Sequence, residues 1–177
     1  MPLEVARSED PFDVFRYAAT LSEADAYHVE AALTASEVDA VALAEPAGGS
    51  HQLMRIWHGL GRRAAVTSNN SAVSIDQYLG MHALARYVDA VGGREGADPA
   101  KLKPDPSVVR RMVQALGVLP ESCVLLGDSV SDVTAAARVG IKMIGLARTA
   151  AKREALLSAG ALVVVATVGS VADVIHQ

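Results

Sequence analysis

Residues 124–132 read Val124-Leu125-Leu126-Gly127-Asp128-Ser129-Val130-Ser131-Asp132. A short apolar run that ends in Gly-Asp is typical of a buried parallel strand that delivers Asp128 to its carboxyl edge, where open α/β sheets bind ligands. The spacing places Asp132 in the first turn of the next helix. Two carboxylates at one edge repel each other unless a cation lies between them, so the pattern favours a divalent metal, Mg²⁺ above all. From these residues alone, the alternative is that Asp128 caps the helix and Asp132 lies on a solvated face.

The composition is that of a globular protein about one domain long. Of the 177 residues, 51% are apolar and only 4% aromatic, which predicts an aliphatic core. The net charge of −4, without any basic tract, argues against nucleic acid or an anionic membrane as partner. The chain start lacks the features of a signal peptide, and no stretch approaches 18 uninterrupted apolar residues. We therefore expect a cytoplasmic protein.

The pattern of helix and strand signals divides the chain in two. Residues 1–45 read as helices that form a partial helical subdomain, with helix starts at Asp10-Pro11 and Ser22-Glu23. In residues 46–177 strands alternate with helices, which predicts an α/β fold with a three-layer, doubly wound parallel sheet. Strands are expected at 64–68, 87–91, 124–127, 143–145 and 162–166, with Asn69-Asn70-Ser71 and Gly92-Gly93 in loops.

Three polar features follow these strands or lie on a nearby loop. Ser68 and Asn69 follow the first strand, Lys103 lies on a loop stiffened by prolines, and Asp128 and Asp132 follow the strand described above. A hydroxyl and a backbone amide can donate hydrogen bonds to phosphate oxygens, and a lysine can neutralise a phosphoryl group and a neighbouring carboxylate. Alone, Ser68 reads as an ordinary loop hydroxyl and Lys103 as a solvated surface charge. Together and in this order they indicate a phosphate site.

In this combination the sequence resembles the haloacid dehalogenase superfamily, whose members are mostly phosphatases of small phosphorylated metabolites. Ala65-Val66-Thr67-Ser68-Asn69 is similar to the second motif of that family, and Lys103-Pro104-Asp105-Pro106 is similar to the third. The segment from Gly127 to Asp132 is similar to the fourth. The resemblance implies a Rossmannoid core over residues 46–177 and a partial helical cap over residues 1–45.

The resemblance also implies a role for each matching residue. Ser68 and Asn69 would bind the transferring phosphoryl group, with Ser68 and Lys103 as catalytic residues. Lys103 would steady both the phosphoryl group and the nucleophile. Asp128 and Asp132 would hold Mg²⁺, directly or through water.

The first motif of the family is absent from the sequence. That motif is a strand ending in Asp-x-Asp, which supplies the nucleophile and the general acid/base, and no such pattern occurs here. Without the nucleophile a phosphoaspartyl intermediate cannot form. In the family this strand lies between those that end here at Ser68 and Asp128, so its loss leaves two apolar strand edges unpaired. Three explanations are open: the two strands pair with each other, a second chain fills the gap, or the chain is a truncated version of a longer protein. We favour truncation.

Two functions therefore stay open. The first is a Mg²⁺-dependent phosphatase of small phosphorylated metabolites, truncated and inactive as the chain stands. The second is a catalytically dead pseudoenzyme that binds phosphate or metal and acts through a partner. An unfilled sheet centre favours self-association, as in a homodimer. A phosphoacceptor receiver domain has its aspartates first and its lysine last, which is the wrong order. A nucleotide-dependent dehydrogenase needs a Gly-x-Gly-x-x-Gly after the first strand, which is missing.

Overall fold

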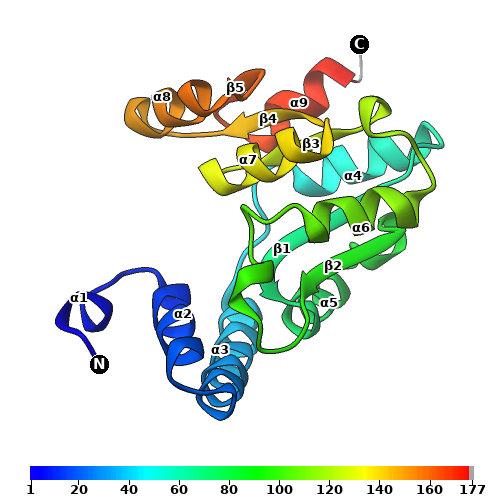
Figure 1. Ribbon diagram of the computed structural model, residues 1–177. Coiled ribbons are helices and arrows are strands. Elements are labelled where there is room, and N and C mark those ends of the chain that lie inside the picture. Colours follow the sequence, from blue (N-terminus) through cyan, green and yellow to red (C-terminus); the bar gives the residue numbers. More distant parts are fainter. Residues whose placement is uncertain (176–177) are drawn as a thin grey trace.

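The computed structural model describes residues 1–175 and shows an α/β protein with an all-helical N-terminal part (Figure 1). None of the helices in that range has both the length and the apolarity needed to cross a lipid bilayer. The N-terminal helices are α1 (Leu3–Ala6), α2 (Pro11–Leu21) and α3 (Glu23–Leu43). The elements that follow are α4 (Ser50–Gly59), β1 (Ala65–Ser71), α5 (Ala72–Met81), β2 (Ala90–Arg94), α6 (Ser107–Leu116), β3 (Val124–Gly127), α7 (Val130–Val139), β4 (Lys142–Leu146), α8 (Ala150–Ala159), β5 (Val163–Val165) and α9 (Val168–Ile175).

The strands are parallel, as predicted, but they form two sheets rather than one. β1 pairs with β2, and Thr67 lies opposite Gly92. The other sheet has the order β3-β4-β5, with Leu125 opposite Met143. Among residues 1–175, β1 and β3 make no ladder with each other. The sheet is therefore divided where the resemblance places the missing strand, and the two flanking strands have not closed up by pairing.

Helices α2 and α3 begin at the caps that the sequence predicts. Asp10 accepts a hydrogen bond from a backbone N–H of α2, and Ser22 accepts one from α3. Phe15 is fully buried and packs with Ala26 of α3 and with Leu102, which lies in the loop after β2. This contact attaches the helices to the α/β part. The predicted division into a cap over 1–45 and a core over 46–177 stays a prediction, and residues 176 and 177 lie outside the described residues.

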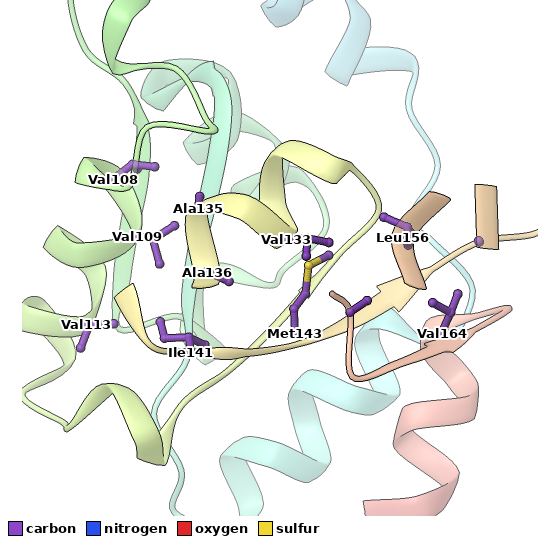
Figure 2. Close-up of a cluster of buried hydrophobic side chains, with 12 residues drawn as sticks. Val108, Val109, Val113, Val133, Ala135, Ala136, Ile141, Met143, Leu156 and Val164 are labelled. Carbon is purple, nitrogen blue, oxygen red and sulfur yellow. The ribbon is translucent and has the colours of Figure 1, made fainter. Parts of the chain in front are cut away.

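The largest buried cluster lies between the three-stranded sheet and the helices α6, α7 and α8 (Figure 2). Val133, Met143, Leu156 and Val164 contribute to it from α7, β4, α8 and β5. The cluster is aliphatic, as the low aromatic content predicts. Val109 joins it from α6, a helix that also packs on β1 and β2. Therefore α6 connects the two sheets, and the contact between α4 and α9 provides a second connection.

Three of the expected strand boundaries were wrong. β1 continues to Ser71, through residues expected to form a loop, and β2 starts at Ala90 and contains both Gly92 and Gly93. The glycines suit this strand because side chains would not fit there. A Cβ on Gly92 would lie 2.8 Å from a methyl carbon of Val108, and one on Gly93 would lie 2.5 Å from a backbone nitrogen of α5. The shift makes Arg94 the last residue of β2.

Candidate functional site

Lys103 lies between the two sheets, close to the carboxyl ends of β1 and β3. Its side chain is only 8% exposed. Nζ donates to Oδ1 of Asp132 at 2.6 Å and to the backbone carbonyl of Thr67 at 3.1 Å. Thr67 belongs to the two-stranded sheet and Asp132 lies in the first turn of α7, the helix that follows β3, so one ammonium group contacts both halves of the fold. An ammonium has three protons, and within residues 1–175 these two acceptors use two of them, which leaves one for a ligand.

The side chain of Asn69 holds the backbone of Lys103. Its Oδ1 accepts from the Lys103 N–H at 2.8 Å, and its Nδ2 donates to the Lys103 carbonyl at 3.4 Å. The sequence predicts that Asn69 binds phosphate together with Ser68. In the structure the polar atoms of its side chain contact the lysine loop, so Asn69 fixes the group that would neutralise a phosphate.

Asp132 is a buried carboxylate with partners on both oxygens. Oδ1 accepts from Lys103, while Oδ2 accepts from the Ser129 hydroxyl at 2.7 Å, the Ser129 N–H at 3.1 Å and the Asp128 N–H at 3.3 Å. Ser129 and Asp132 form the capping box of α7. Burial alone would raise the pKa of Asp132, but the charge of Lys103 and the hydrogen bonds from Lys103 and Ser129 outweigh burial and lower the pKa.

We expect the free energy of unfolding of the metal-free protein to fall in acid, in part through Asp132. The pKa of Asp132 in the folded protein lies below its usual value of 3.8. Its contribution to the free energy of unfolding is therefore complete above pH 3.8 and is lost as the pH falls through the folded-state pKa. Urea unfolding in EDTA, from neutral pH to about pH 3, measures this loss. Asp132→Asn should give a flatter dependence over the same range, and equal slopes for the two proteins would contradict the assignment.

The carboxylate of Asp128 is in a different environment from that of Asp132. It pairs with Nζ of Lys152 at 2.6 Å, and its side chain is 63% exposed. Lys152 lies in the first turn of α8 and was missed by the sequence analysis. The signal that could have found it is its place shortly after β4, since the carboxyl ends of neighbouring parallel strands share one edge. Each carboxylate of the expected metal pair therefore has its own lysine.

Of the two expected metal ligands, only Asp128 presents an exposed carboxylate to a cation. No group of three or more His, Cys, Asp or Glu side chains among residues 1–175 could enclose a metal ion. Mg²⁺ is often held by one or two carboxylates together with water and phosphate oxygens, and Asp128 fits that mode of binding. Asp132 lies behind it and accepts a hydrogen bond from the Asp128 backbone.

Ser68 lies at the same edge, beside a cavity of about 260 Å³. Its hydroxyl accepts a hydrogen bond from the Asn70 N–H at 3.1 Å. Asn69 and Arg94 also line the cavity, as does Arg111 of α6. Arg94 is the second residue that the sequence analysis missed, because the strand that it ends was expected to stop at residue 91. The structure thus places Ser68 next to Asn69, which contacts Lys103, whereas Lys103 and Asp128 are not among the residues that line this cavity.

This chain matches a known protein family over most of its length. The model of the haloacid dehalogenase-like hydrolases matches residues 13–146. The chain belongs to this family. The resemblance inferred from the motifs at Ser68, Lys103 and Asp128 is therefore confirmed.

Relatives of this haloacid dehalogenase-like hydrolase include phosphatases. The phosphoglycolate phosphatase of Colwellia psychrerythraea is 33% identical over 87 residues, which cover 49% of this chain and 37% of that protein. The phosphoglycolate phosphatase of Rhodospirillum rubrum is 34% identical over 86 residues, covering 49% of this chain and 34% of that protein. The chain spans less than half the length of these curated relatives.

Solved structures support the same fold. CbbY of Rhodobacter sphaeroides, in complex with xylulose-(1,5)-bisphosphate, is 25% identical with a TM-score of 0.63, covering 75% of this chain and 59% of that one. A crystal structure from Clostridium difficile matches 98% of this chain and 80% of that one with a TM-score of 0.72 at 15% identity. The predicted α/β class with its Rossmannoid parallel strands is confirmed.

Proposed function

We propose that residues 1–175 carry the phosphate- and metal-binding part of a Mg²⁺-dependent phosphatase of small phosphorylated metabolites, and that this chain alone does not turn over. The observation that carries the proposal is the placement of Lys103, which is buried between Asp132 and the Thr67 carbonyl with one proton free. The family and its phosphoglycolate phosphatase members support the reaction class. They also support a small phosphorylated acid as the kind of substrate to test first.

Each residue of the site has a distinct part in this proposal. The Ser68 hydroxyl and the remaining proton of Lys103 donate to phosphoryl oxygens. Asn69 holds the Lys103 backbone, and Asp132 holds its ammonium. Asp128 is the residue that would hold Mg²⁺, which would neutralise charge on the phosphoryl group.

Among residues 1–175 the site has no Asp-x-Asp nucleophile, and the fold leaves a position for one. The edges of β1 and β3 that would face a strand between the two sheets are unpaired in the described part of the chain. Lys103 contacts Thr67 within β1 and Asp132 in the first turn of α7, the helix that follows β3. A parallel strand that ended in Asp-x-Asp between β1 and β3 would bring its carboxylates to Lys103 and Asp128. This strand would be the part of the enzyme that truncation removes.

The experiment adds that strand. The chain as it stands should not hydrolyse p-nitrophenyl phosphate with Mg²⁺. A fusion in which an apolar strand ending in Asp-x-Asp precedes Met1 through a long flexible linker should gain turnover, because it supplies the nucleophile and the general acid/base. The matched control carries Asn-x-Asn in the same fusion and should stay inactive.

The alternative function is binding of phosphate or metal without chemistry, through a partner chain. The observation in its favour is that Asp128 and Asp132 each already have a lysine as counter-ion. Inactive fusions that still bind inorganic phosphate would support this alternative and refute the phosphatase. Turnover by the unmodified chain, abolished by Asp128→Asn, would refute inactivity.

Sedimentation at several protein concentrations tests the proposed homodimer.

Mg²⁺ affinity gives a separate prediction. Lys152 competes with a cation for Asp128, in an exposed pair of the kind that contributes about 0.2–1 kcal/mol. Lys152→Met should therefore tighten Mg²⁺ binding by a factor of about 1.4 to 5, while Asp128→Asn should abolish it. Calorimetric titration measures both. An unchanged affinity in Asp128→Asn would show that the cation binds elsewhere.

A further inference from the structure

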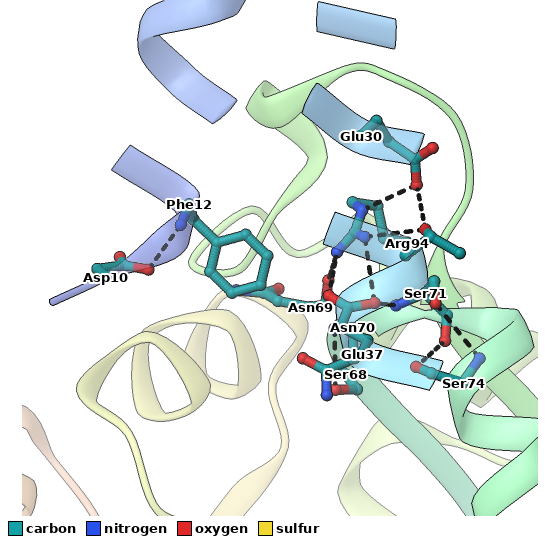
Figure 3. A network of polar contacts seen from close by, with 11 residues as sticks. Asp10, Phe12, Glu30, Glu37, Ser68, Asn69, Asn70, Ser71, Ser74 and Arg94 are labelled. Atoms are coloured by element: carbon teal, nitrogen blue, oxygen red, sulfur yellow. Dashed lines mark hydrogen bonds and ion pairs between the residues drawn. The ribbon is translucent and has the colours of Figure 1, made fainter. Parts of the chain in front are cut away.

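Arg94 lies at the end of β2 in a buried polar network that reaches the N-terminal helices (Figure 3). Its side chain is only 2% exposed. Nε lies 3.2 Å from a carboxylate oxygen of Glu30, and the two Nη atoms lie 2.8 and 3.2 Å from the two oxygens of Glu37. Thr34 accepts from the same guanidinium at 3.2 Å. The three α3 partners follow one another at helical spacing, so one face of α3 binds Arg94.

The same guanidinium also contacts the phosphate site. Nη1 of Arg94 donates to the backbone carbonyl of Asn69 at 2.8 Å. Glu37 reinforces this contact, because its Oε2 accepts from the backbone N–H of Ser71, two residues further along β1. The end of β1 is thus bound to α3 from two sides, once through Arg94 and once directly.

Asn69 links Arg94 to Lys103. Its backbone carbonyl binds Arg94, and its side chain binds the Lys103 backbone through both the N–H and the carbonyl. Lys103 in turn binds Asp132. A continuous chain of hydrogen bonds therefore runs from α3 through Arg94, Asn69 and Lys103 to α7.

The chemistry of this network requires arginine. A guanidinium presents five donors in a planar fork, which allows Arg94 to bind Glu37 through two nitrogens and still reach Glu30, Thr34 and Asn69. A lysine at this position would keep the charge but could not satisfy all four partners. The fork therefore fixes the distance between α3 and the end of β1.

We propose that Arg94 is a positioning residue: by holding α3 and the Asn69 carbonyl together, it sets the place of Lys103 in the phosphate site. The position of Lys103 therefore depends on whether the N-terminal helices are packed against the end of β1. The consequence for phosphate rests on the proposed function, whereas the positioning of Lys103 does not.

Amide hydrogen exchange of the whole chain, followed by NMR, tests the positioning. The reporter is the Lys103 N–H, which donates to Asn69, and the reference is the N–H of Met143 in the middle strand of the other sheet. Arg94→Lys should accelerate exchange at Lys103 about tenfold and leave Met143 unchanged. The matched control is Arg111→Lys, which alters a more exposed arginine on the rim of the same cavity and should leave both amides unchanged. Equal acceleration at both amides, or none at Lys103, would overturn the proposal.

A second variant covers the case in which Arg94→Lys does not fold. Glu37→Gln keeps the size of the side chain and removes its charge, and it should accelerate Lys103 exchange severalfold with the same selectivity. If neither variant accelerates Lys103 exchange selectively, Arg94 has only a structural role.

Phosphate affinity then connects the proposal to the site. Titration with inorganic phosphate in Mg²⁺ should give a Kd that rises about fivefold in Arg94→Lys and in Asn69→Ala, with no further rise in the double variant, because both act through Lys103. Additive effects would contradict a shared route. If the unaltered chain does not bind phosphate, the proposed function fails, while the exchange at Lys103 still decides the role of Arg94.

Discussion

Replacing Lys103 with methionine should lower the free energy of unfolding by about 3–5 kcal/mol and abolish phosphate binding. The loss is large because Asp132 would remain as a buried carboxylate without its cation, and removal of one partner from a buried ion pair costs about this much. Phosphate binding would fail because the positive charge at the ends of β1 and β3 would be gone. Urea unfolding measures the first effect, and titration with inorganic phosphate measures the second.

Lys101 provides the matched control, two residues earlier in the same loop. Its side chain is 69% exposed, and its nearest carboxylate, on Asp98, lies 3.6 Å away. Lys101→Met should change the free energy of unfolding by about 0.5 kcal/mol or less. A similar loss in both variants would show that the loop tolerates no change, and it would remove the evidence for the special place of Lys103.

Leu156→Ala should cost about 2–5 kcal/mol of unfolding free energy. Leu156 is buried in the main aliphatic cluster beside Val133, Met143 and Val164, so truncation loses apolar contact and leaves a cavity. Leu157 is the neighbouring residue of the same type and is 43% exposed. Leu157→Ala should cost less than about 1 kcal/mol. Urea unfolding of both variants checks the expected difference, and equal losses would mean that the cluster is packed differently.

The sequence predicts the alternation of strands and helices in the α/β part well, because the residues that start and end each element lie next to it in the sequence. The apolar run before Gly127, the capping serine at 129 and the glycine after α7 each specify a boundary with their neighbours alone. The ends of β1 and β2 were wrong for the opposite reason. Gly92 and Gly93 read as loop residues, and only packing against Val108 and α5 shows that a strand without side chains is needed there.

The candidate site was predicted in part for the same reason. The carboxyl ends of parallel strands meet at one edge of a sheet, where ligands bind. Together with the order of the motifs along the chain, this predicts that Ser68, Lys103 and Asp128 belong to one site. The partners of these residues depend on contacts that are distant in the sequence. The pairing of Asp128 with Lys152 and of Arg94 with α3 requires the position of α8 and of the N-terminal helices, which no local pattern contains.

The edges of β1 and β3 that are unpaired among residues 1–175 affect how the protein behaves in concentrated solution. An edge strand presents unpaired N–H and carbonyl groups, on which an extended segment of a neighbouring molecule can add and so begin ordered aggregation. β3 has only four residues, and its first, Val124, is exposed. We therefore expect unwanted association between molecules to start at β3 during storage or crystallisation. Because β3 is short, a strand from a neighbouring molecule would be bound there only weakly.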